Sequence, residues 1–270
     1  MARVDALARG VGKGPMTCCG TLTLTFQTAA WSTYWVPTER ASRRCFAACS
    51  ALRTATGSIA IDGRDLRQMS VRERARTIAH IPQTHESVYD YSVLDVVLMS
   101  AASQAGAFGV PRADQVKRAW EALERVGIAR LAHRPATRIS GGEQQLVLIA
   151  RALAQNAHTI IMDEPTSALD YGNTMRVLGC VRQLAREGLS IIQSTHQPDQ
   201  AFLFADKVLA INKGHVRAFG DPRDVITEEL VAELYGVDVS ICSLFGDRMR
   251  VCVPSQEIDV TGQDARSRVK

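Results

Sequence analysis

The 270-residue chain lacks the marks of several protein classes. No apolar run reaches the ~20 residues that a membrane-spanning helix needs. The first residues, "MARVDALARGVGKGP", contain no continuous apolar region, so we do not expect a secretory signal. The net charge of +4 is small, and no basic stripe with interleaved aromatic residues occurs. Nucleic acid is therefore not expected as a partner.

Zinc-site spacing is also missing. Seven cysteines occur, four of them between Cys18 and Cys49, but none is paired with histidines at the intervals of a zinc ligand set. Reduced thiols in a cytosolic protein are the simpler interpretation. The bulk composition, 46% hydrophobic and 22% charged, is ordinary for a globular protein.

Glycine is absent from one long stretch. None occurs between Gly20 and Gly57, whereas two of the three tryptophans and two cysteines fall there. A loop that wraps its backbone around a phosphate needs glycine, because only glycine lets the backbone approach so closely. This stretch therefore cannot supply such a loop as it is written.

From Gly57 onward the sequence alternates strand-like and helix-like segments. The segments "SIAIDG", "ARTIAHIPQ", "HTIIMDEP" and "LSIIQSTH" read as strands, and "KVLAINKGHVRAFG" reads as a hairpin that turns at Lys213 and Gly214. The segments "ADQVKRAWEALERVGIARL", "GGEQQLVLIARALAQN", "NTMRVLGCVRQLAREG" and "GDPRDVITEELVAELYGVDV" read as helices. No strand is evident between Gln83 and Ser140. The pattern predicts an α/β layer with a mostly parallel sheet and an inserted helical lobe.

Two motifs carry residue types suited to phosphate chemistry. The strand "TIIMDEP" ends in Asp163 and Glu164, at the edge where parallel sheets bind ligands. An Asp there can hold Mg²⁺ through water, and a Glu can polarise a water molecule, although acidic residues also end strands merely for solubility. In "ISGGEQQ", Ser140 is a natural N-cap and two glycines open a helix N-terminus that favours anions. An ordinary capped helix would explain "SGG" alone.

A third motif, "STHQ", places His196 directly after a buried strand. A lone histidine is usually structural. All three motifs together, in this order and spacing, favour a shared function.

With "HIPQ" and "SALD" added, the set resembles the ATP-binding subunits of ABC transporters from Gly57 to about Val239. "HIPQ" resembles the family's Q-loop, "SGGEQQ" its signature motif, "IIMDE" its Walker B motif, "SALD" its D-loop and "STHQ" its switch histidine. The resemblance implies a P-loop NTPase (RecA-like) α/β core. It places the ATP-binding domain at residues 1–245, with the core at 1–85 and 155–245, a helical subdomain at 86–154, and a C-terminal extension at 246–270.

The resemblance also implies roles for individual residues. Glu164 would orient or deprotonate the attacking water, and His196 would touch the γ-phosphate. Asp163 and Gln83 would support Mg²⁺ through water, and Gln83 would also sense the nucleotide. ATP would be sandwiched between two copies arranged head to tail, with nucleotide contacts from the following residues: Ser140, Gly141, Gly142, Glu143 and Asp170. Catalysis would consist mainly of positioning and charge neutralisation.

The chain departs from the family at the Walker A loop, Gly-x-x-Gly-x-Gly-Lys-Ser/Thr. That loop should follow a strand such as "TLTLTF", but its place holds "VPTERASRR". Re-reading the codons one base out of register forces leucine at the step from Tyr34 to Trp35 and glycine at the step from Trp35 to Val36. The permitted codons around them accommodate "GRLVHLLGPNGAGKSTLL" at every step. We therefore hypothesise that roughly residues 28–51 are translated out of register.

The lobe sequence and the segments "MDEPTSALDYGN", "STHQPDQAF" and "ITEELVAELYGVDV" resemble the subfamily that imports iron chelates, haem, cobalamin and, in some members, molybdate. Such a subunit would lie on the cytoplasmic face of the membrane. It would bind a separate integral-membrane permease and act indirectly with a periplasmic or surface substrate-binding protein. Val93, Val96, Val97 and Met99 could face the permease or simply pack the lobe.

Two other functions stay open at this point. A chain without a Walker A loop could be a non-hydrolysing ABC domain that acts as an interaction or regulatory module. A soluble ABC ATPase that works on nucleic acid or ribosomes is a third class, but such proteins commonly carry two ATPase units or long coiled insertions, and neither occurs here. We expect little or no ATP hydrolysis from the chain as written.

Overall fold

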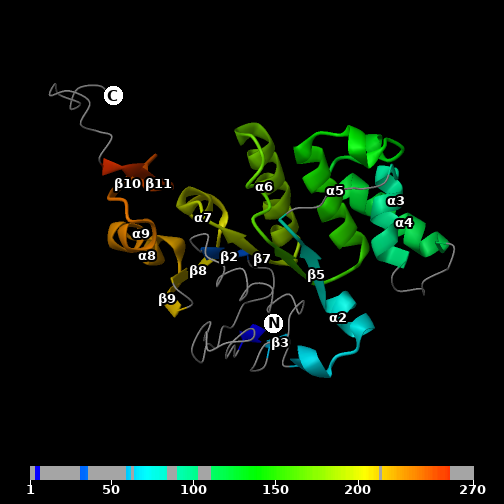
Figure 1. Ribbon diagram of the computed structural model, residues 1–270, viewed down its shortest axis with the longest axis horizontal. Helices are drawn as coiled ribbons and strands as arrows, with labels where there is room; N and C mark the ends of the chain where they lie inside the picture. The colour runs from blue at the N-terminus through cyan, green and yellow to red at the C-terminus, as the bar shows by residue number, and fades with distance from the viewer. Residues whose placement is uncertain are drawn as a thin grey trace.

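The structure is a computed structural model, and it describes residues 4–6, 31–35, 59–61, 64–83, 90–102, 111–212 and 215–255. Its centre is a six-stranded sheet (Figure 1) with the order β5-β6-β7-β2-β8-β9. Five strands run parallel, and only β9 is antiparallel to its neighbour β8. The strand bounds are β5 Ile78–Ile81, β6 Thr159–Met162, β7 Ser190–Thr195, β2 Trp31–Trp35, β8 Lys207–Asn212 and β9 His215–Gly220. The α/β class predicted from the sequence is confirmed.

The central strands are buried along their whole length. Every residue of β6 and of β7 is buried. This explains why their sequences read as nearly continuous apolar runs rather than as alternating patterns, since helices cover both faces of a parallel sheet. The expected strand "TLTLTF" and the turn at Lys213 and Gly214 lie outside the described residues.

A helical lobe lies beside the sheet, at the right of Figure 1. It contains α3 (Val93–Ala102), α4 (Ala113–Arg125), η2 (Ala129–Leu131), η3 (Ala136–Arg138) and α5 (Gly141–Ala154). Val93 and Val97 are fully buried, and Val96 is 7% exposed, so these three residues pack the lobe instead of facing a partner. Met99 is 47% exposed and is the one member of that group on the surface.

A small antiparallel sheet of order β1-β3-β4 accompanies the core, with β1 at Val4–Ala6, β3 at Ile59–Ile61 and β4 at Arg64–Asp65. The turn η1 (Leu66–Gln68) and the short helix α2 (Val71–Thr77) connect it to β5. Ser70 caps α2 by accepting the N–H of Glu73, while the Glu73 carboxylate accepts the N–H of Ser70. This reciprocal cap explains why the helix begins at Val71.

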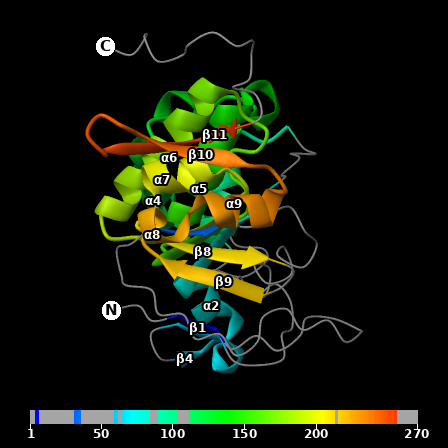
Figure 2. The same cartoon turned by 90° about the vertical axis from the view of Figure 1, so that its left-hand side faces the viewer.

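Beyond the lobe, α6 (Tyr171–Arg186) packs on α5, and α7 (Pro198–Phe204) follows β7. The C-terminal part has α8 (Pro222–Val225), α9 (Glu228–Tyr235) and a hairpin of β10 (Val239–Leu244) and β11 (Met249–Pro254). Figure 2 shows this hairpin lying across α7, and β11 contacts that helix. Sequence analysis did not foresee the hairpin, and the expected boundary after residue 245 falls in its turn.

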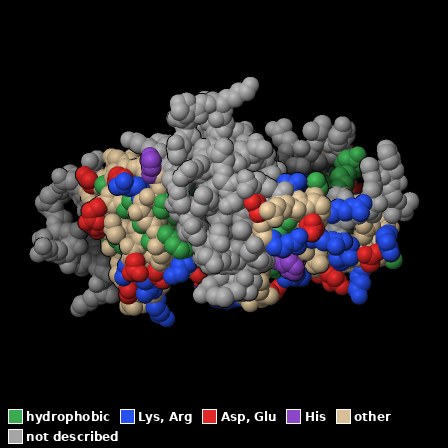
Figure 3. Space-filling view, turned by 90° about the horizontal axis from the view of Figure 1, so that it is seen from below, with side chains coloured by type: hydrophobic (Ala, Val, Ile, Leu, Met, Phe, Trp, Pro, Cys, Tyr) green, Lys and Arg blue, Asp and Glu red, His purple; other side chains and the backbone are tan. Residues whose placement is uncertain are grey.

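No helix in the described part of the chain is long and apolar enough to cross a membrane. The face drawn in Figure 3 carries Lys and Arg interspersed with Asp and Glu among its described residues.

Candidate functional site

Asp163 and Glu164 stand at the carboxyl edge of the sheet, directly after β6. The Asp163 N–H donates to the carbonyl of Ile81 at 2.9 Å, which continues the β5–β6 pairing by one residue. Glu164 then adopts a φ of +42°, in the left-handed region that non-glycine residues seldom occupy. Such a conformation persists only where the surroundings enforce it, and it is common at active sites.

Ser194, near the end of β7, joins both acidic residues. Its hydroxyl donates to Asp163 Oδ1 at 2.6 Å and accepts the N–H of Glu164 at 2.9 Å. Ser194 is 5% exposed, so these bonds are protected from solvent. This contact holds Glu164 in its unusual conformation. Sequence reasoning missed the role of Ser194, although a serine two residues before the histidine of "STHQ" was a visible signal.

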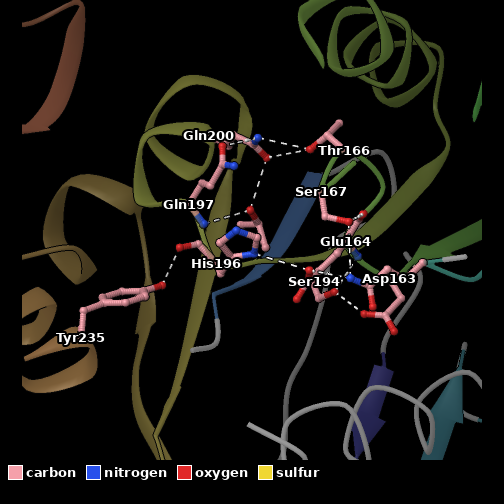
Figure 4. A network of polar contacts seen from close by, with 11 residues as sticks. Asp163, Glu164, Thr166, Ser167, Ser194, His196, Gln197, Gln200 and Tyr235 are labelled. Atoms are coloured by element: carbon pink, nitrogen blue, oxygen red, sulfur yellow. Dashed lines mark hydrogen bonds and ion pairs between the residues drawn. The ribbon is translucent and has the colours of Figure 1, made fainter. Parts of the chain in front are cut away.

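The side chains of Gln83 and His196 converge on Glu164, and Figure 4 shows the His196 ring beside this residue. Gln83 Nε2 donates to Glu164 Oε2 at 2.9 Å and lies 3.4 Å from Ser167 Oγ. His196 Nδ1 lies 3.5 Å from the same Glu164 oxygen; this nitrogen is buried and has no hydrogen bond to any described residue. The Glu164 side chain is only 10% exposed. Thus four residues from three separate loops, Gln83, Asp163, Glu164 and His196, form one cluster.

His80 lies on β5, close enough to Asp163 and Arg151 to be affected by the charge of both. Burial lowers the pKa of His80 below its usual value, and the Asp163 carboxylate acts in the opposite direction. Burial disfavours a charged imidazole, so this side chain adds little positive charge beside Asp163 at neutral pH.

A buried hydrogen-bond network around Gln200 holds together the two loops that carry Glu164 and His196. The Gln200 side chain, on α7, is 5% exposed and exchanges hydrogen bonds with Thr166 Oγ1 at 3.2 and 3.3 Å. Thr195 Oγ1 donates to Gln200 Oε1 at 3.2 Å. Gln200 therefore ties the loop after β6 to the end of β7, as Figure 4 shows.

The other predicted residues form a second group at the N-termini of α5 and α6. Ser140 caps α5 by accepting the N–H of Glu143 at 3.3 Å, and Glu143 Oε2 accepts the Ser140 N–H at 3.1 Å. Arg130 donates to the other Glu143 oxygen at 2.9 Å. The Ser140 N–H, followed by its hydroxyl and by Arg130, keeps the pKa of Glu143 below its usual value. Gly141 is exposed at the helix start.

Because Gly142 has no side chain, the N-terminus of α5 can approach the N-terminus of α6 closely. A Cβ at Gly142 would stand 2.3 Å from Asn173 Oδ1 and 2.8 Å from Asn173 Cβ. Asn173 in turn donates its N–H and its side-chain amide to the Asp170 carboxylate, at 2.8 and 2.7 Å. The backbone N–H of Asn173 is the main reason why the pKa of Asp170 is lowered. The structure thus joins the signature-like and D-loop-like segments of one chain to each other.

A strand of the sheet, β2, directly precedes "VPTERASRR", the segment that stands in the place of the phosphate loop. Strand β2 lies between β7 and β8, and its last residue, Trp35, pairs with Thr195 and Ala210. The chain therefore leaves β2 at the carboxyl edge, opposite Thr195, the last residue of β7 before His196. Residues 36–58, which include the rest of the segment hypothesised to be out of register, lie outside the described residues.

The donor set fits Mg²⁺ bound together with phosphates. Among the described residues no group of three or more His, Cys, Asp or Glu could hold a metal. Mg²⁺ commonly needs only one or two carboxylates, with water and substrate phosphates as its other ligands. Asp163 offers one carboxylate, and Gln83, whose nitrogen donates to Glu164, carries an amide oxygen as a second possible ligand.

Comparison with known proteins places this chain in a family. An ABC transporter family model matches residues 46–167. An ABC transporter ATP-binding protein of Haemophilus influenzae is 40% identical over 179 residues, which cover 66% of this chain and 68% of that protein. The chain belongs to the family of ABC transporter ATP-binding proteins.

Other ABC proteins extend the comparison. The hemin import ATP-binding protein HmuV of Rhodococcus jostii is 35% identical over 69% of this chain and 63% of its own length. Further relatives are named for import of molybdate, phosphonates and cobalamin. A metal-chelate type ABC transporter in an inward-facing conformation matches with a TM-score of 0.81 and 27% identity, over 94% of this chain and 96% of its own. The fold predicted from the motifs, a P-loop NTPase core with a helical subdomain, is that of the ABC cassettes.

The match to the ABC family model begins at Phe46, after the glycine-free "VPTERASRR". The family model therefore supports the resemblance over residues 46–167.

Proposed function

We propose that this chain is the ATP-binding and ATP-hydrolysing subunit of an ABC importer that energises uptake of a metal chelate. ABC transporter ATP-binding proteins are ATPases coupled to transport. The observation that carries the proposal is the convergence of Gln83, Asp163, Glu164 and His196 at one edge of the sheet. The structural match to a metal-chelate type ABC transporter over 94% of the chain supports this cargo class over the other cargoes for which the relatives are named.

In this proposal Glu164 is the group that accepts a proton from the attacking water. Its carboxylate is nearly buried, and its backbone is held by Ser194. Gln83 and His196 approach the same carboxylate oxygen, so both can respond to what binds in front of it. Mg²⁺ would be held by Asp163 and, through water, by Gln83, where it would neutralise phosphate charge.

The second group, Ser140 to Glu143 with Asp170, would meet the nucleotide of another copy. These residues sit on helix starts, where free backbone N–H groups favour phosphate. Two copies arranged head to tail would then enclose ATP between the Glu164 cluster of one and the α5 start of the other. Closure would exclude water and convert nucleotide binding into movement of the attached subunits.

An integral-membrane permease is the second proposed partner. A groove of about 400 Å³ on the helical lobe is lined by Tyr91, Asp95, Leu98, Met99 and Pro111. Tyr91 and Met99 are 43% and 47% exposed. We assign this groove to the permease, and a substrate-binding protein would act only indirectly. The subunit would then lie on the cytoplasmic face of the membrane, with the domain division at 1–85, 86–154, 155–245 and 246–270 expected from the sequence.

The missing phosphate loop divides this proposal into two cases. Because β2 ends beside Thr195, a loop after Trp35 would reach the edge that carries Glu164 and His196. If residues 28–51 result from a shifted reading frame, the corrected chain has its loop and hydrolyses ATP. If the chain exists as written, its glycine-free segment favours the alternative function, a non-hydrolysing ABC domain that acts as an interaction or regulatory module.

Three measurements test the proposal. Sequencing the gene over codons 28–55, with mass spectrometry of the native protein, decides whether the present codons are real. ATP binding and hydrolysis are then compared between the chain as written and a chain that carries "GPNGAGKST". We expect turnover only in the second, and we expect Glu164→Gln to lower that turnover ~100-fold or more while nucleotide binding persists. A loop-restored chain that neither binds nor cleaves ATP would refute the assignment.

A further inference from the structure

The peptide group between His196 and Gln197 is held at both of its ends. The Tyr235 hydroxyl donates to the carbonyl of His196 at 2.6 Å, and the N–H of Gln197 donates to Thr195 Oγ1 at 3.1 Å. Together these bonds fix the plane of the peptide, and that plane sets the direction in which the chain passes the histidine. Among the described residues the polar contact of His196 Nδ1 is the 3.5 Å approach to Glu164, without a hydrogen bond, so the backbone is a main constraint on where the imidazole lies.

The hydroxyl belongs to Tyr235, the last residue of α9, which is far from the site in sequence (Figure 4). Helix α9 is anchored to the edge of the sheet by Glu233, whose carboxylate accepts from Arg217 at 2.8 Å and from Asn212 at 3.0 Å. Its C-terminus is closed by Gly236 at a φ of +68°, where a residue with a side chain would be strained. These contacts hold α9 against the sheet and so fix the position of Tyr235.

A second set of contacts holds the segment on its other side. Gln200 Nε2 donates to Gln197 Oε1 at 2.6 Å. Asp199 accepts the N–H of Cys252 at 2.8 Å, which ties α7 to strand β11 of the C-terminal hairpin. The loop that carries His196 is thus enclosed by elements that follow it in the chain, and Figure 1 shows α7, α9 and the hairpin stacked at one end of the molecule.

We propose that Tyr235 is a positioning residue for His196, so that helix α9 belongs to the hydrolytic machinery and is more than a structural appendage. Tyr235 acts through the His196 carbonyl and touches no reacting atom. This inference rests on the proposed role of His196 beside the γ-phosphate. Its structural part, the control of the His196–Gln197 peptide, can be measured without nucleotide.

The test replaces Tyr235 by Phe, which removes the hydroxyl and keeps the ring in its apolar surroundings. Tyr171→Phe, at a side chain 80% exposed on α6, is the matched control. In the chain as written, we expect the Gln197 amide to exchange with solvent about fivefold faster in Tyr235→Phe and at the parental rate in Tyr171→Phe. Thr195→Val should produce the same local change, and Thr195→Ser, which keeps the hydroxyl, should not.

A second measurement uses the loop-restored chain. There Tyr235→Phe should lower kcat severalfold and leave KM for ATP unchanged, because the histidine would be misplaced without loss of nucleotide contacts. Unchanged Gln197 exchange, equal acceleration at all amides, or an unaltered kcat in an active enzyme would overturn the inference. If the loop-restored parent does not hydrolyse ATP, the proposed function fails, and the exchange measurement still decides whether Tyr235 positions the peptide.

Discussion

Replacing Gly142 by alanine should destabilise the protein through a single neighbour. The added Cβ would meet Asn173 at 2.3 Å from Oδ1, 2.5 Å from Cγ and 2.8 Å from Cβ. The last of these atoms cannot move by rotation of the side chain alone, so the starts of α5 and α6 must separate or Asn173 must give up Asp170. Overpacking of this kind costs about 1–3 kcal/mol. Alanine regains less than about 1 kcal/mol in helix propensity. We therefore expect a net loss of about 1–2 kcal/mol.

Equilibrium urea unfolding of four variants measures this cost. Gly141→Ala is the matched control, since a Cβ there meets only Leu169 Cδ2 at 3.5 Å, and its stability should stay within about 0.5 kcal/mol of the parent. Asn173→Ala removes Oδ1 and Cγ but leaves the Cβ at 2.8 Å, so Gly142→Ala should cost less in that background and still more than Gly141→Ala. The reasoning is refuted if Gly142→Ala costs the same with and without the Asn173 side chain, or if Gly141→Ala is equally harmful.

Three further predictions concern stability, pH and reactivity. Ser194→Ala should lower the unfolding free energy by about 1–3 kcal/mol, because it leaves the Glu164 N–H and the Asp163 carboxylate without their shared partner. A denaturant titration measures this loss, and a change below about 0.5 kcal/mol would contradict the reasoning. Glu143 has a lowered pKa in the folded protein, so its contribution to stability is present above the unfolded value of about 4.3 and is lost as pH falls through the lower folded value. Unfolding curves of Glu143→Gln and the parent should therefore differ at pH 7 and converge in acid, whereas a difference independent of pH would exclude the ionic contribution. Burial raises the pKa of the Cys252 thiol to about 12. A thiol reagent at pH 7.5 should therefore modify the exposed Cys242 well before Cys252, as measured by peptide mass spectrometry. Equal rates would show that burial does not protect Cys252.

Much of the core could be predicted from the sequence because its signals are local. The apolar runs around Ile161 and Ile192 identify buried strands, and the carboxylates and histidine that follow them mark the binding edge of a parallel sheet. Ser140 followed three residues later by Glu143 is a capping box, which predicts the start of a helix. The hairpin after Val239 could not be predicted in this way, since its two strands are only half-buried and alternate weakly.

The sequence alone determined the order of the chemical groups and, through them, the family. It also revealed that a phosphate loop is missing after Trp35. Which of these groups contact one another depends on the folded arrangement of the chain. Ser194 lies 31 residues from Asp163, and Tyr235 lies 39 residues from His196, and each pair is joined by one hydrogen bond. Strand order and helix packing create such contacts, and no local pattern encodes them, because a hydrogen bond depends on distances that are set only when the sheet is assembled.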